Sequence, residues 1–85
     1  MTQIIFEGRT YNLTGEADFT SRYFQSFNYI DAEDGEEYQF EMSCPCTDED
    51  GNDYIMYWIF EDVRGNEKEL DCFDYENGVS RVEHL

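Results

Sequence analysis

The sequence predicts a mainly β protein, an antiparallel meander sheet or open barrel of six to seven strands with at most one short helix. Glycine-centred turn signals recur along the chain, and the stretches between them alternate apolar with polar residues or are rich in aromatic and β-branched residues. Asp-Gly and Asn-Gly pairs tolerate the positive φ angles of type I′ hairpin turns. The turn signals are Glu7-Gly8, Asp34-Gly35, Asp50-Gly51, Gly65-Asn66 and Asn77-Gly78.

The beginning of the chain fits a first hairpin. Ile4 and Phe6 fall on one face of a first strand, and Tyr11 and Leu13 suit a second. We expect the Glu7-Gly8 turn to join them.

The next stretch is ambiguous. Gly15–Arg22 is compatible with a loop or with one short helix. Tyr23–Ile30 either extends that helix or forms a strand paired across Asp34-Gly35, and its aromatic content favours the strand.

The second half of the chain completes the meander. Glu37–Cys46 alternates with period two, which is typical of a half-buried strand. Tyr54–Phe60 is apolar on both faces and is predicted to be a central strand. Glu67–Phe73 and Val79–His84 are predicted to follow as further strands.

Acidity dominates the composition. The chain has 21 Asp and Glu against 5 Lys and Arg, a formal net charge of −16. Nucleic-acid binding requires a basic surface, and anionic membranes repel an acidic protein, so we expect neither as a direct partner. The expected partner is a basic protein, including one that normally holds DNA or RNA.

Length and cysteine content indicate one domain in the cytoplasm. The 85 residues fit a single acidic β-rich domain spanning 1–85. Met1-Thr2-Gln3 lacks the features of a secretion signal, and no apolar run is long enough for a membrane span. An odd count of 3 cysteines fits reduced thiols. An exposed edge strand would allow a homodimer as well as a monomer.

The acids concentrate in the middle of the chain. No Lys or Arg occurs between Arg22 and Arg64, where more than half of the acids fall, and the meander is expected to place many of them on two neighbouring turns. Carboxylates at i and i+2 of a strand lie about 6.6 Å apart, a spacing comparable to that of phosphates along a nucleic-acid strand. The predicted contact set is Asp31, Glu33, Asp34, Glu36, Glu37, Asp48, Glu49, Asp50 and Asp53.

This pattern favours nucleic-acid mimicry, in which the acids compete for a basic groove and binding weakens steeply with salt. Three alternatives remain open. The acids form a solvated face that maintains solubility, they adapt the protein to high intracellular salt, or they steer an immunity or regulatory module to a basic partner while aromatic residues supply the affinity.

A small, very acidic, aromatic-rich domain with the acidic span Asp31–Asp62 resembles the DNA-mimic inhibitors carried by phages and other mobile elements. Among these, it is most similar in type to anti-CRISPR proteins. The resemblance lies in size and charge rather than in a motif. It implies an inhibitor in the host cytoplasm that occupies the DNA- or RNA-binding groove of a host defence nuclease or its surveillance complex, and it brings no catalytic residue.

The acidic stretch Asp48–Asp53 begins like a calcium-binding EF-hand loop. Asp53 stands where that loop needs glycine, and Ile59 stands where it needs glutamate. The flanking segments are predicted strands rather than helices. An acidic hairpin turn is therefore the better interpretation.

Zinc is a second metal to weigh. Cys44, Cys46, Cys72 and His84 would supply four ligands, but the Cys44-Pro45-Cys46 spacing is shorter than the usual gap. On a strand, Cys44 and Cys46 share one face, where they suit the core. We expect no metal or other cofactor.

Catalysis finds little support. His84 is the one histidine, and no glycine-rich phosphate loop is present. We therefore expect a protein that is not an enzyme. The aromatic residues expected mainly in the core are Tyr54, Tyr57, Trp58, Phe60, Phe73 and Tyr75, and those expected to be most exposed are Tyr29, Tyr38 and Tyr75.

Overall fold

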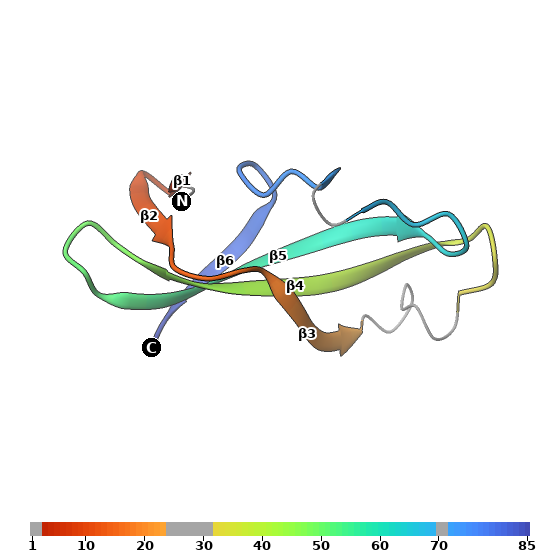
Figure 1. Cartoon of the computed structure of the whole chain (residues 1–85), viewed down its shortest axis with the longest axis horizontal. Helices are drawn as coiled ribbons and strands as arrows, with labels where there is room; N and C mark the ends of the chain where they lie inside the picture. The colour runs from red at the N-terminus through yellow and green to blue at the C-terminus, as the bar shows by residue number, and fades with distance from the viewer. Residues whose placement is uncertain (1–2, 24–31, 70–71) are drawn as a thin grey trace.

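The computed structural model describes residues 3–23, 32–69 and 72–85, and shows six strands in one open antiparallel sheet (Figure 1). No α-helix occurs in these three ranges. The prediction of a mainly β antiparallel fold is confirmed. The strands are β1 (Gln3–Phe6), β2 (Arg9–Leu13), β3 (Asp18–Tyr23), β4 (Glu37–Thr47), β5 (Asp53–Val63) and β6 (Val79–His84).

The long hairpin of β4 and β5 forms the axis of the molecule (Figure 1). Each strand has 11 residues, and they pair without interruption from Glu37 opposite Val63 to Thr47 opposite Asp53. This hairpin gives the protein its elongated shape, with principal extents of 45 × 23 × 20 Å.

Strand β4 is central because both of its edges are paired. Along one edge lies β5, and along the other lie β2 and then β3. Leu13 of β2 pairs with Cys46, and Phe19 of β3 pairs with Met42. Beyond them, β1 pairs with β2 and β6 pairs with β5, so that the sheet runs β1-β2-β4-β5-β6 with β3 beside β4.

Two predicted elements need correction. The loop or short helix expected over Gly15–Arg22 gives way to β3 from Asp18 onward, because the backbone groups of β4 need partners along this edge. The strand expected over Glu67–Phe73 is wrong for the part that the structure describes, 67–69 and 72–73. There the Lys68 N–H donates to the carboxylate of Asp62 at 3.0 Å instead of joining a ladder. Of the strand expected over Tyr23–Ile30, residues 24–31 lie outside the described residues.

The core lies on one face of the β4–β5 hairpin. The even-numbered residues of both strands face it, and Met42, Cys44, Met56 and Trp58 are each 0% exposed. The prediction that Cys44 and Cys46 are small core residues is confirmed. Ile4 and Tyr11 of the β1–β2 hairpin join this cluster, and Phe73 and Tyr75 pack against it.

The segment before β6 is tied to the core by its aromatic residues. Trp58 donates a hydrogen bond from Nε1 to the carbonyl oxygen of Tyr75 at 2.8 Å. Phe73 stacks on Phe60 with ring centroids 4.8 Å apart. Gly78 closes the turn, since a Cβ there would lie 2.8 Å from the Asp74 carbonyl oxygen and 3.0 Å from Phe60 Cε1.

The expectations for exposed aromatic residues were partly wrong. Tyr38 is buried, because it shares the core face of β4 with Phe40. Tyr75 is half-buried against Trp58, at a ring-centroid distance of 5.2 Å. Tyr29 lies outside the described residues. Tyr57, expected in the core, lies half-buried on the opposite face of β5.

Candidate acidic interaction surface

The described members of the predicted contact set gather at the two ends of the β4–β5 hairpin. Antiparallel strands alternate in direction, so successive turns of a meander lie at opposite ends of the sheet. Ten residue steps of β4 separate the two ends, about 33 Å at about 3.3 Å per residue. The tip pole comprises Asp48, Glu49, Asp50 and Asp53; the base pole comprises Glu33, Asp34, Glu36 and Glu37. Asp31 lies outside the described residues.

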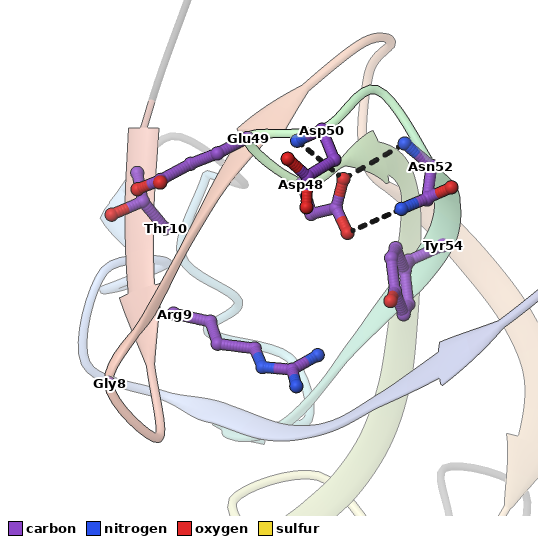
Figure 2. Close-up of a pocket in the computed structure, with 8 residues that line it drawn as sticks. All are labelled: Gly8, Arg9, Thr10, Asp48, Glu49, Asp50, Asn52 and Tyr54. Carbon is purple, nitrogen blue, oxygen red and sulfur yellow. Dashed lines mark hydrogen bonds between the residues drawn. The ribbon is translucent and has the colours of Figure 1, made fainter.

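Asp48 organises the tip pole. Its Oδ1 accepts hydrogen bonds from the N–H groups of Asp50 and Asn52, both at 2.9 Å, and its Oδ2 accepts one from the Asn52 side chain at 3.1 Å (Figure 2). These bonds, led by that of the Asn52 side chain, lower the pKa of the Asp48 carboxyl. Glu49, Asp50 and Asp53 are exposed. The turn therefore holds one carboxylate inward and presents three to solvent.

A cleft of about 380 Å³ separates the tip pole from the β1–β2 turn. Glu7 and Gly8 form that turn with φ angles of 51° and 78°, as a type I′ turn requires. Arg9 extends its guanidinium into the cleft, and Tyr54 lines it beside Asp48 (Figure 2). The cleft thus combines one cation, several carboxylates and a phenol ring.

Hydrogen bonds between two turns fix the base pole. The Glu36 N–H donates to the Glu33 carbonyl at 2.9 Å, and Glu36 Oε1 accepts from the Glu33 N–H at 3.0 Å. The Gly35 N–H donates to the Arg64 carbonyl oxygen at 2.8 Å, which joins this turn to the β5 end. Asp34 and Glu37 are exposed beside it.

Three exposed acids that the predicted contact set left out lie near the base pole. Glu61 lies opposite Gln39, whose side chain donates to Glu61 Oε1 at 2.8 Å. Glu67 and Glu69 follow in the segment after β5. The strand register could have identified Glu61, because pairing Glu37 with Val63 brings the end of β5 beside the start of β4.

Two acids of the middle span are structural rather than exposed. Glu41 is 2% exposed and accepts hydrogen bonds from Thr20 Oγ1 and Arg81 Nη1, each at 2.9 Å. Asp62 is 6% exposed and accepts from the N–H groups of Val63 and Lys68. Both carboxylates are thus satisfied within the fold, and the exposed charge of the hairpin is left mainly at its ends.

The four candidate zinc ligands lie in different environments. Cys44 and Cys46 are buried, Cys72 is exposed, and the His84 ring packs on Tyr54 at 4.8 Å. Burial, with a smaller contribution from Cys44, raises the pKa of the Cys46 thiol to about 11. Within the described ranges, no group of three or more His, Cys, Asp or Glu residues is placed to hold a metal ion.

Comparison with known proteins finds no protein-family model, curated protein or solved structure that matches the chain. In the part of the chain that the structure describes, no helix is long and apolar enough to cross a membrane.

Proposed function

We propose that the protein is a non-catalytic inhibitor that mimics nucleic-acid charge and blocks the DNA- or RNA-binding groove of a host defence complex, as an anti-CRISPR protein does. The observation that carries the proposal is the separation of the two acidic poles by about 33 Å of paired strand. One helical turn of B-DNA spans about 34 Å. The poles therefore present carboxylates at a distance comparable to that between phosphates one turn apart.

The hydrogen bonding of the hairpin supports this role. Both poles are held by backbone and side-chain hydrogen bonds, and β4 between them is paired on both edges. A preorganised surface loses little conformational freedom on binding. Exposed carboxylates held in this way can replace phosphates against the Lys and Arg side chains of a basic groove.

The test begins with the tagged full-length chain and lysate of the host cell, at low and physiological salt. Two double variants neutralise one pole each: Glu49→Gln with Asp50→Asn at the tip, and Asp34→Asn with Glu37→Gln at the base. A third double variant, Glu16→Gln with Glu76→Gln, removes the same charge from exposed positions outside both poles.

Mimicry predicts capture of a nucleic-acid-binding protein that added DNA or RNA displaces. Each pole variant should weaken capture more than the Glu16/Glu76 variant does, and the higher salt should weaken all of them. A captured partner that nucleic acid does not displace would contradict mimicry. If all three double variants lost capture equally, net charge alone and not the position of the acids would explain the binding.

A second candidate is an acidic interaction module that binds a basic partner without mimicking nucleic acid. The mixed cleft at the tip pole favours it, because Arg9 places a positive charge among the acids (Figure 2). A phosphate backbone offers no such cation. Under this function the partner keeps its nucleic acid while bound, and Arg9→Met weakens the complex.

A further inference from the structure

An open groove lined by aromatic side chains lies next to the base pole. Its volume is about 480 Å³, and Phe19, Tyr38, Phe40 and Phe73 contribute to its walls. Phe40 lies between the other two phenylalanine rings, 5.6 Å from Phe19 and 5.4 Å from Phe73 between ring centroids. Phe19 is 54% exposed, so one face of its ring is open to a ligand.

The rim of the groove is charged. Asp62, Glu67 and Glu69 line it together with Lys68. The buried Asp62 carboxylate accepts the Lys68 N–H at 3.0 Å, which fixes the rim segment against β5. The groove therefore combines an aromatic floor with a predominantly acidic edge.

A cation of the chain itself, Lys68, already lies beside one ring of the groove. Its ammonium lies 5.8 Å from the centroid of the Phe73 ring, within the range of a cation–π interaction. A cation next to these rings is attracted both by their π faces and by the negative charge of the nearby carboxylates. An anionic ligand would be repelled by the same rim, and a neutral apolar ligand would leave the rim charges without a counterpart.

We infer that this groove binds an arginine side chain of the protein partner, with the guanidinium stacked against the exposed Phe19 ring and its charge matched by Glu67 and Glu69. Arginine fits better than lysine because its planar guanidinium stacks on rings and is more weakly hydrated. The inference rests on the proposed function, since it specifies how the basic partner is gripped. It adds a short-range contact to the long-range attraction of the poles.

The test titrates the full-length protein, at physiological salt, with short glycine–serine peptides that carry a central Arg-Arg, Lys-Lys or citrulline-citrulline pair. Citrulline keeps the shape of arginine without its charge. Chemical shifts of the phenylalanine rings report the site, and calorimetry gives the affinity. The Arg peptide should bind saturably, the Lys peptide more weakly, and the citrulline peptide least.

Variants locate the binding. Phe19→Ala should lower the affinity for the Arg peptide about tenfold, a change equivalent to a partly desolvated cation–π contact. Ile5→Ala, at a residue 70% exposed on β1, is the apolar control and should leave the affinity unchanged. Glu67→Gln with Glu69→Gln should weaken binding more than Glu49→Gln with Asp50→Asn, which removes the same charge from the tip pole. Circular dichroism verifies that each variant is folded.

Three results would overturn the assignment of the groove as an arginine site. They are no saturable binding of the Arg peptide, equal affinity for the citrulline peptide, or equal losses of affinity in the two charge-matched double variants. The outcome is separable from the proposed function. If nucleic acid displaces the captured partner but the Arg peptide does not bind, the arginine site is wrong and the proposed mimicry stands. If the Arg peptide binds at Phe19 but nucleic acid does not displace the captured partner, the arginine site stands and the proposed mimicry is wrong.

Discussion

Arg81 donates a 2.9 Å hydrogen bond from Nη1 to Oε2 of Glu41, across the width of strand β5. The Glu41 side chain is 2% exposed and that of Arg81 is 37% exposed, so the basic side chain covers the acid. The guanidinium lies 3.9 Å from the centroid of the Tyr57 ring. Thr20 of β3 completes the contact from the other side, so this one carboxylate links β3, β4 and β6.

Replacing Arg81 with Met is expected to lower the free energy of unfolding by about 2 kcal/mol, because Glu41 keeps its charge but loses its ionic partner. The loss should fall short of that for a fully buried pair, since Arg81 is partly open to water. Urea denaturation measures the change. Arg9→Met removes the same charge from an exposed position and should change stability by less than about 0.5 kcal/mol. Equal effects would mean that the Arg81–Glu41 contact adds nothing beyond net charge.

Local patterns predicted much of this fold. The period-two alternation of Glu37–Cys46 identified the core face of β4, and Asp50-Gly51 identified the turn that joins it to β5. Both are properties of neighbouring residues in the sequence. Cysteines at i and i+2 of a strand share a face for the same reason, so their burial could be predicted.

Long-range partners could not be predicted in the same way. Nothing in the sequence distinguishes Glu41 from the other acids, because its partner Arg81 lies 40 residues away along the chain. Likewise, Asp62 becomes structural because the segment after β5 turns back and donates the Lys68 N–H to it. The separation of the contact acids into two poles follows from which end of the hairpin each turn occupies. The aromatic groove combines residues of β4 with β3 and the segment after β5, and local signals misled in the last two regions.

Trp58 offers a test of the core. Trp58→Phe removes the donor to the Tyr75 carbonyl oxygen and leaves a cavity in a site that is 0% exposed. The expected loss in the free energy of unfolding is about 2–3 kcal/mol, from an unpaired carbonyl together with lost packing. Far-UV circular dichroism in urea measures it without relying on indole fluorescence. A loss below about 0.5 kcal/mol would show that the segment carrying Tyr75 does not depend on this bond.

The three cysteines should differ in reactivity. Cys44 and Cys46 are buried, and burial raises the pKa of both thiols, that of Cys46 to about 11. Thiolate is the reactive form, so at pH values near neutrality a thiol reagent should modify Cys72 rapidly and the other two slowly. In denaturant all three should react. Mass spectrometry of timed samples counts the modifications, and fast modification of Cys46 in the folded protein would contradict its placement in the core.

The tip pole should make a pH-dependent contribution to stability through Asp48. Hydrogen bonds from Asn52 and from the backbone lower the pKa of this carboxyl in the folded protein. A lowered pKa means that the carboxylate stabilises the folded state above the unfolded pKa, about 3.9 for Asp, and that this stabilisation is lost as the pH falls through the folded value. Asp48→Asn should therefore be destabilising at pH 7 and become progressively less so under acidic conditions.

Asp50→Asn provides the matched control, because it removes one charge from the same turn without removing the Asp48 carboxylate. Both variants relieve the same repulsion among the acids of the tip pole. The difference between their unfolding free energies then isolates the hydrogen bonds of Asp48. That difference should be largest at neutral pH and shrink as the pH falls below about 4. Identical pH profiles for the two variants would mean that the Asp48 hydrogen bonds do not stabilise the turn.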